Sequence, residues 1–238
     1  ITTFAPDADP ANLSITWQSQ AGKLYDIVGT TDPSADPQVW TPVVSDITST
    51  PPENTENFTK PVDAFTAFAV LEKPLPPIFE DDFEGDLGWT MGVDGGSETA
   101  WARGTPTVVG PAAANSPVNC YATNLAADYG VDADIWLRSP EIDLSTVTAA
   151  TLSFWQFHDI EADFDAGAVR VLKSSDLTQL GADIVNPVDG TITEWTEFSA
   201  ALPAAAIGEN IVLEFRFTSD DSEVFAGWYV DDVSLTEE

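Results

Sequence analysis

Cysteine and histidine are nearly absent from this sequence. Among 238 residues there is one of each, Cys120 and His158. A single thiol cannot form an internal disulfide, so cross-links do not hold the fold, and a buried, inert Cys120 is expected. One histidine excludes multi-histidine metal sites, and no nucleophile-elbow motif accompanies His158 to suggest a hydrolytic triad.

Basic residues are also scarce. Eight Lys and Arg stand against 40 Asp and Glu, which gives a net charge of −32. Nucleic acids and anionic membranes are bound through Lys and Arg, so neither is an expected partner. Two interpretations of the acidity remain open and compatible: the carboxylates keep the surface hydrated in salt, or some of them bind Ca²⁺.

Long apolar runs are missing as well. No segment approaches the ~20 apolar residues that span a bilayer, so no membrane insertion is expected. The chain does not begin with Met and shows no signal peptide. We interpret it as a mature or excised piece of a secreted or cell-surface protein. Its 43% hydrophobic content predicts a globular fold.

Extended helical periodicity is absent, and short alternating runs take its place. In residues 211–217, Ile211, Phe215 and their alternate neighbours share one face, while Glu214 and Arg216 share the other. Such alternation predicts an all-β fold. Further strands are expected at residues 13–18, 23–30, 39–44, 66–71, 151–157 and 168–172. Residues 200–207, which include Pro203, are expected to form a loop.

A proline-rich segment, Lys73-Pro74-Leu75-Pro76-Pro77, predicts a stiff connector between two modules. The predicted organisation is a small β-sandwich at 1–73, a linker at 74–77 and a larger β-sandwich at 78–238. Residues 1–76 hold 10 acids and 3 bases, whereas residues 77–238 hold 30 acids and 5 bases. Most of the negative charge therefore belongs to the second module.

The first module resembles the fibronectin type III or immunoglobulin-like sandwiches of secreted bacterial proteins. The matching residues are Leu13-Ser14-Ile15-Thr16-Trp17, Gly22-Lys23-Leu24-Tyr25, Asp32, Trp40 and Ala67-Phe68-Ala69-Val70.

The second module carries a longer ordered set of motifs. They are Phe79-Glu80-Asp81-Asp82-Phe83-Glu84, Gly88-Trp89-Thr90, Ala122-Thr123-Asn124-Leu125, Leu137-Arg138-Ser139-Pro140, Leu152-Ser153-Phe154-Trp155 and Gly227-Trp228-Tyr229-Val230-Asp231-Asp232-Val233. In this order the set resembles the cleaved-adhesin or MAM-like (choice-of-anchor-type) jelly roll. The resemblance implies a concanavalin-like double sheet, structural Ca²⁺ and no catalysis of its own.

A first candidate metal site comprises Asp82, Glu84 and Asp232. In a jelly roll the first and last strands commonly lie side by side, so these distant carboxylates can converge. Crowded carboxylates repel one another, and a hard cation with oxygen ligands removes the repulsion. The resemblance also places Ca²⁺ here, with Asn124 as a further ligand. The alternative is a solvated acidic edge.

A second candidate site comprises Asp159, Glu161, Asp163 and Asp165. In a continuous strand these four would face one way, about 6–7 Å apart. Three alternatives stay open: a Ca²⁺ site, a solvated loop, or a catalytic row resembling the Glu-x-Asp-x-Glu strand of laminarinase-like glycoside hydrolases. The final Asp departs from that pattern.

Two further acidic and aromatic features complete the candidates. Asp220, Asp221 and Glu223 indicate a solvated turn. Trp136 and Trp195 are candidate ligand-binding platforms, because an exposed indole can stack on a sugar ring. The remaining tryptophans within the matched motifs are expected in the core.

The leading hypothesis is a non-catalytic extracellular, calcium-binding module pair for adhesion, assembly or substrate targeting. Its partner would be a polysaccharide, a cell-surface protein or copies of the chain itself. The alternatives are a carbohydrate-binding protein, a self-assembling filament or surface-layer subunit, and a glycoside hydrolase that uses Glu161 and Asp165.

Overall fold

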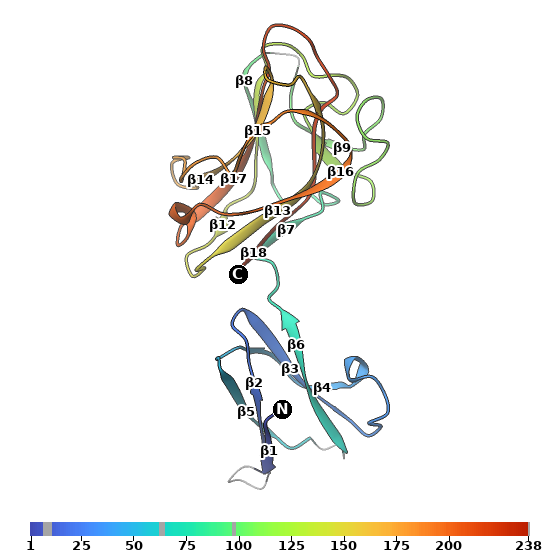
Figure 1. Ribbon diagram of the computed structural model, residues 1–238, viewed down its shortest axis with the longest axis vertical. Coiled ribbons are helices and arrows are strands. Elements are labelled where there is room, and N and C mark those ends of the chain that lie inside the picture. The colour runs from blue at the N-terminus through green and yellow to red at the C-terminus, as the bar shows by residue number, and fades with distance from the viewer. Residues whose placement is uncertain (7–10, 62–64, 97–98, 238) are drawn as a thin grey trace. The chain divides into compact units, whose positions relative to one another are not determined.

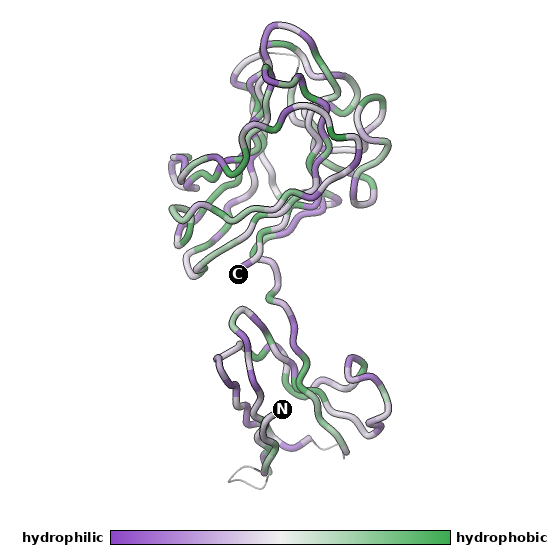
Figure 2. The backbone as a smooth tube through the Cα atoms, viewed as in Figure 1, coloured by the Kyte–Doolittle hydropathy of each residue, from purple (hydrophilic) through white to green (hydrophobic). Residues whose placement is uncertain are grey.

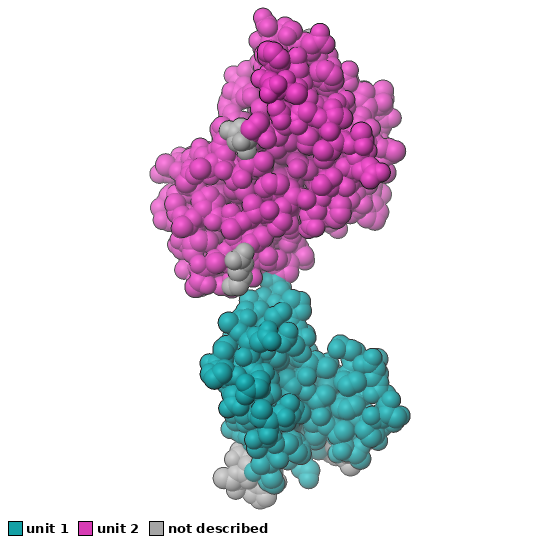
Figure 3. Space-filling view, in the orientation of Figure 1, with its two compact units in different colours: residues 1–76 teal, residues 77–238 magenta. Residues whose placement is uncertain are grey.

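The chain is all-β, as predicted, and consists of two compact units, residues 1–76 and 77–238 (Figures 1 and 3). This computed structural model describes residues 1–6, 11–61, 65–96 and 99–237. Among these residues no helix is long and apolar enough to cross a membrane. The boundary between the units falls within the proline-rich segment.

Unit 1 is a sandwich of two three-stranded antiparallel sheets. One sheet has the order β1-β2-β5 and the other the order β4-β3-β6. Its strands are β1 (Thr3–Pro6), β2 (Asn12–Gln18), β3 (Lys23–Thr30), β4 (Thr41–Thr48), β5 (Glu53–Thr59) and β6 (Ala67–Pro74).

The core of unit 1 is formed by Ile15, Trp17, Tyr25, Ile27 and Phe58. Ile15 and Trp17 on β2 are separated by a more exposed residue, as are Tyr25 and Ile27 on β3, so both strands turn one face inwards. The strand expected at residues 39–44 begins later, because Pro37–Val39 forms a 3₁₀ turn. The Asp36 side chain caps that turn by accepting a hydrogen bond from the Gln38 N–H at 3.0 Å.

Unit 2 is the predicted jelly-roll sandwich of two larger antiparallel sheets. The first sheet has the order β16-β13-β18-β10-β9, with β7 also paired to β18. The second has the order β15-β14-β17-β11-β8, with β12 also paired to β17. Its strands are β7 (Phe79–Asp81), β8 (Thr90–Gly95), β9 (Ala102–Gly104), β10 (Cys120–Ala122), β11 (Asp134–Arg138), β12 (Ile142–Asp143), β13 (Ala150–Ile160), β14 (Ala166–Lys173), β15 (Val185–Val188), β16 (Gly190–Ala201), β17 (Asn210–Thr218) and β18 (Gly227–Glu237).

An aromatic core joins the two sheets of unit 2. The Phe154 and Phe215 rings lie 5.2 Å apart, and the Phe215 and Trp228 rings 5.7 Å apart. Each ring comes from a different strand and is fully buried. Figure 2 shows that hydrophobic and hydrophilic residues are interspersed along the strands of unit 2. Residues 200–207, which were expected to form a loop, comprise the end of β16 and the short 3₁₀ turn Ala204–Ala206.

The first and last strands of unit 2 lie side by side, as the sequence predicted. β7 pairs antiparallel with β18, with Asp81 opposite Val233. A β-bulge interrupts β18 at Asp232, which has a φ of +47°. The extra residue shifts the alternation, so Val230 and Val233 both reach the core although they are three residues apart.

Candidate functional site

The segment 161–165 forms a turn between β13 and β14, so the continuous strand with four aligned carboxylates is not formed. The Asp165 N–H donates to the Glu161 carbonyl at 3.2 Å. Asp163, with a φ of +70°, is exposed at the tip of the turn. Because Glu161 and Asp165 close this turn, the two residues come together, whereas the exposed Asp163 is not part of their group. The alternatives for residues 159–165 were a Ca²⁺ site, a solvated loop and a catalytic row on one strand. The observed turn does not align the carboxylates as the catalytic row requires.

Strand register brings a third carboxylate to the same place. Ala166, at the start of β14, pairs with Thr218, at the end of β17. The residues just beyond this pair, Asp165 and Asp220, are therefore neighbours, and the Asp220 N–H donates to Asp165 Oδ1 at 2.7 Å. One carboxylate oxygen from each of Glu161, Asp165 and Asp220 lies within 4.8 Å of the others. We call these three residues the acidic cluster.

Asp165 is the fixed member of the acidic cluster. Its side chain is 1% exposed, and its Oδ2 accepts a hydrogen bond from the Tyr129 hydroxyl at 2.6 Å. The same hydroxyl accepts the Glu161 N–H at 3.1 Å. Tyr129 is itself buried, with its ring 4.8 Å from that of Phe217. The hydrophobic core thus holds the acidic cluster in position.

Glu161 is the unsatisfied member of the acidic cluster. Its Oε2 is buried and has no hydrogen-bond partner among the described residues. Desolvation raises the pKa of Glu161 above its ordinary value, and the negative charges of Asp220, Asp165 and Glu223 raise it further. Crowding of this kind is relieved by a cation, and an all-oxygen donor set suits a hard divalent ion. The acidic cluster can therefore hold a metal ion.

The other members of the second candidate set lie outside this cluster. Asp159 is on β13 and accepts a hydrogen bond from the Thr191 hydroxyl at 2.7 Å. Asp163 donates its backbone N–H to Asp189 at 3.1 Å. Asp220 was missed as a candidate ligand because its sequence context is that of an ordinary surface turn. Only the β14–β17 pairing reveals its neighbours.

The residues of the first candidate set are tied to the loop that precedes β10. Glu84 accepts hydrogen bonds from the Asn119 backbone N–H at 2.8 Å and from its side-chain amide at 3.1 Å. Asp232 accepts from the Asn115 side chain at 2.7 Å. Asp82 and Asp232 line one depression of about 490 Å³.

Asn124 is held separately from these carboxylates. Its Oδ1 accepts the Ala126 N–H at 3.3 Å, and its backbone carbonyl accepts the Tyr229 hydroxyl at 3.2 Å. A metal site that combines Asp82, Glu84, Asn124 and Asp232 stays a prediction.

Asp231 is a buried carboxylate that sequence reasoning left out of the site. It is fully buried, and its oxygens accept the backbone N–H groups of Asn115, Ser116 and Asp232 at 2.8, 3.1 and 2.9 Å. Burial raises its pKa to about 7, with a further rise from the adjacent Asp232 charge, although the three N–H groups act in the opposite direction. Asp231 therefore anchors the loop over the outer face of the first sheet.

The two candidate tryptophan platforms are both half-buried. The indole of Trp136 lies across Gly92 on the outer face of the second sheet, and the Arg138 guanidinium covers it at 3.9 Å from the ring centroid. Trp195 packs on Phe157, and its Nε1–H donates to the Ala113 carbonyl at 2.9 Å. Their role as ligand-binding platforms stays a prediction.

The comparisons with known proteins come from sequence and from structure. No family model matches the chain. Bacillopeptidase F of Bacillus subtilis (strain 168) is 34% identical over 160 residues, which cover 67% of this chain and 11% of that protein. The chain thus spans about a tenth of this curated relative.

Solved structures resemble the chain at low sequence identity. The K1 cleaved adhesin domain of Lys-gingipain from Porphyromonas gingivalis W83 has a TM-score of 0.44 and 18% identity, with 67% of this chain and 98% of that domain covered. A carbohydrate-binding module of Cellvibrio mixtus lichenase 5A in complex with cellotriose has a TM-score of 0.40 and 12% identity, with 68% and 99% covered. The enzymatically active domain of tailspike protein 4 of bacteriophage CBA120 has a TM-score of 0.46 and 12% identity, with 66% of this chain and 20% of that chain covered. These likenesses concern the fold alone.

Proposed function

We propose that the chain is a non-catalytic, extracellular module pair in which Ca²⁺ bound at the acidic cluster stabilises the jelly roll of unit 2. The module pair would serve adhesion, assembly or substrate targeting within a larger protein. The observation that carries this proposal is the meeting of Glu161, Asp165 and Asp220 from two connections far apart in sequence.

The chemistry of the acidic cluster supports Ca²⁺ over transition metals. Its donors are carboxylate oxygens, and neither histidine nor cysteine is among them. Among the described residues, no salt bridge compensates any of the three carboxylates. An ion at this position would accept the buried Glu161 Oε2 as a ligand and would join the β13–β14 turn to the β17–β18 connection. Ca²⁺ would thereby reinforce two strand ends that are already joined by strand pairing and by the hydrogen bond from the Asp220 N–H to Asp165.

The same geometry argues for a structural role of these carboxylates. Asp165 is buried and accepts two short hydrogen bonds, from the Tyr129 hydroxyl and from the Asp220 N–H. A general acid has to reach a substrate oxygen with its proton, and Asp165 presents no exposed oxygen for that purpose. Glu161 and Asp165 therefore serve better as ligands and anchors than as a catalytic pair.

Thermal unfolding of the full chain tests the proposal. Calcium at about a hundred times its dissociation constant stabilises the folded state by about 2.7 kcal/mol, which for a unit of this size is roughly 5–10 °C in melting temperature. We expect EDTA to lower the melting temperature and Ca²⁺ to restore it. Glu161→Gln should remove the response, whereas Glu194→Gln, at an exposed position on β16, should keep it. An identical wild-type melting curve in EDTA and in Ca²⁺ would refute the calcium assignment.

The carboxylates of the first candidate set can be separated from the acidic cluster in the same assay. If the ion sits between Asp82, Glu84 and Asp232 instead, Asp232→Asn will abolish the calcium response and Glu161→Gln will leave it intact. If each of the two variants loses only part of the calcium response, the chain binds two ions.

A polysaccharide partner is the second candidate function. The observation that favours it is a depression of about 290 Å³ on unit 2, where the Phe157 ring lies beside Asp159 and Thr191. An apolar ring next to carboxylate and hydroxyl groups is a suitable surface for a neutral sugar. Affinity electrophoresis in gels that contain neutral polysaccharides tests it, with Phe157→Ala as the variant expected to lose retardation. Equal mobility in every gel would count against a sugar ligand.

A further inference from the structure

Unit 2 carries a depression whose walls come from two neighbouring strands and one loop. Its volume is about 290 Å³, and it is lined by residues 110–112, Phe157, Asp159, Thr191, Thr193 and Ala226. We call it the β13–β16 depression. It combines an apolar floor with a few polar groups, as small-molecule sites commonly do.

Strand register brings the lining side chains of the β13–β16 depression together. Asp159 of β13 lies opposite Thr191 of β16. Phe157 and Thr193 are each two residues away along their own strands, and alternate residues of a strand share one face. An aromatic ring, a carboxylate and two hydroxyl groups therefore converge on one small surface.

The loop that forms the remaining wall is held on both sides of its lining segment. The Val109 carbonyl accepts a hydrogen bond from the Tyr229 hydroxyl at 3.1 Å, and the Ala113 carbonyl accepts one from the Trp195 Nε1–H at 2.9 Å. Gly110, with a φ of +77°, lies against the Tyr229 ring, where a Cβ atom would overlap it. The depression is therefore preformed, which lowers the entropic cost of binding.

Asp159 gives the β13–β16 depression its charge. Its Oδ1 accepts a hydrogen bond from the Thr191 hydroxyl at 2.7 Å, and among the described residues no Lys, Arg or His forms an ion pair with it. The lining residues include no basic side chain. The face of an aromatic ring such as that of Phe157 also attracts cations. The depression therefore suits a ligand that combines a flat apolar face with a cationic group.

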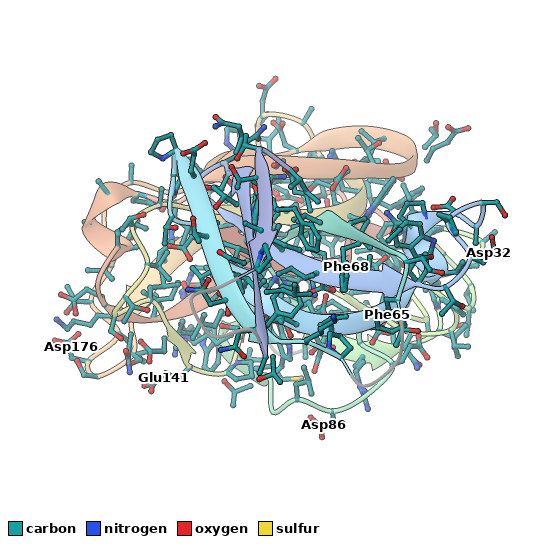
Figure 4. The ribbon with its side chains drawn as sticks, turned by 90° about the horizontal axis from the view of Figure 1, so that it is seen from below. Asp32, Phe65, Phe68, Asp86, Glu141 and Asp176 are labelled. Carbon is teal, nitrogen blue, oxygen red and sulfur yellow. The ribbon has the colours of Figure 1, made fainter. Side chains whose placement is uncertain are left out.

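The charge of unit 2 as a whole acts in the same direction. Residues 77–238 hold 30 acids and 5 bases, a net charge of −25. The exposed carboxylates of Asp86, Glu141 and Asp176 project from three separate connections of unit 2 (Figure 4). Sugars with carboxylate or sulfate groups are repelled by such a field, whereas a protonated amine is attracted.

We infer that the β13–β16 depression, in the sugar-binding role proposed above, prefers a protonated amino sugar. The pyranose ring lies on Phe157, the ammonium group donates to Asp159, and ring hydroxyl groups meet Thr191 and Thr193. A lysine side chain would also pair with the carboxylate, but it offers no ring face and no hydroxyl groups to the other lining residues. The ligand class is a polysaccharide with free amino groups.

Isothermal titration calorimetry of the full chain tests this preference. The probes are three sugar trimers with the same β-1,4-linked backbone, which carry a hydroxyl group (cellotriose), an amino group or an acetamido group at C2. Trilysine is the control for a cation without a sugar ring. The titrations are done at about pH 6, where aliphatic amines are protonated, and at about 0.15 M salt, which screens long-range attraction.

We expect the amino trimer to bind about tenfold more tightly than cellotriose and the acetamido trimer, because hydrogen bonds between charged groups are stronger than neutral ones. Asp159→Asn should remove this preference and leave cellotriose binding unchanged, since asparagine can still accept the Thr191 hydroxyl. Asp163→Asn removes the same charge at an exposed position outside the depression and should keep the preference.

Two kinds of result would overturn the inference. If cellotriose or the acetamido trimer binds as tightly as the amino trimer, the amino-sugar preference is wrong and the sugar-binding function stands. Equal losses in Asp159→Asn and Asp163→Asn, or equally tight binding of trilysine, would show that the chain attracts any cation, and would overturn it as well. Absence of binding by all three trimers would refute both the preference and the sugar-binding function. None of these outcomes depends on calcium at the acidic cluster.

Discussion

The buried carboxylate of Asp231 predicts an unusual pH dependence of stability. Its folded-state pKa is raised to about 7, whereas an unfolded aspartate titrates near ~3.9. Below pH ~3.9 the carboxyl group is protonated in both the folded and the unfolded state, so Asp231 does not lower the free energy of unfolding. As the pH rises through the folded-state pKa, the folded protein has to ionise a carboxylate that water cannot reach.

The magnitude follows from the shift. A rise of about three pKa units corresponds to about 4 kcal/mol at about 1.4 kcal/mol per unit. The sign is fixed by proton uptake: between these two pKa values the folded state binds more protons than the unfolded state, so this group makes the free energy of unfolding fall as the pH rises. We expect Asp231→Asn to remove this fall, because asparagine does not titrate. Any change in the hydrogen bonds to Asn115 and Ser116 adds an offset that does not depend on pH.

The assay is urea unfolding in EDTA from about pH 3 to about pH 8, a range that spans both pKa values. The quantity compared is the difference in unfolding free energy between wild type and Asp231→Asn at each pH, because other carboxylates titrate in both proteins. This difference should move by about 4 kcal/mol across the range in favour of the variant. The exposed Glu194→Gln serves as the control. Parallel curves for wild type and Asp231→Asn would refute the reasoning.

Three further predictions concern packing and reactivity. Gly92→Ala should destabilise unit 2 by about 1–3 kcal/mol in urea unfolding, because its methyl group would overlap the Trp136 indole; Gly85→Ala, which meets open space, is the control. A Gly92→Ala stability equal to that of Gly85→Ala would contradict this packing. Phe215→Ala should cost about 3–5 kcal/mol, while Phe164→Ala, at a 67% exposed residue, should leave the unfolding midpoint near that of wild type. Burial raises the pKa of the Cys120 thiol, so a thiol reagent should react only after denaturant is added, and rapid labelling of the native chain would show that the thiol is accessible.

Several parts of the fold could be predicted because they depend on local pattern. The alternation in residues 211–217 placed Leu213 and Phe215 in the core, and both are fully buried. The strand expected at residues 23–30 is observed as β3 with the same bounds. Side chains on a strand alternate between two faces, so a sequence that alternates in polarity determines both the strand and its buried face.

Predictions that needed backbone detail were less complete. The four carboxylates at 159–165 would align only in a continuous strand, and the i to i+4 turn that joins Glu161 to Asp165 shows that the strand is interrupted there. The choice between a Ca²⁺ site and a solvated loop stays a prediction. The bulge at Asp232 lies next to the buried Asp231, which is held by the backbone N–H groups of Asn115 and Ser116. Asp is one of the few non-glycine residues that adopt a positive φ readily. The sequence is therefore compatible with this bulge but contains no pattern that predicts it.

By itself, the sequence determined that this protein is an all-β sandwich pair with its negative charge concentrated in the second unit, since composition and alternation are local properties. The tertiary structure decided which carboxylates meet. Asp220 joins Glu161 and Asp165 only because β14 pairs with β17, and Trp136 is covered only because Gly92 and Arg138 lie against it. Strand register brings together residues dozens of positions apart, and no local pattern encodes which strands become neighbours.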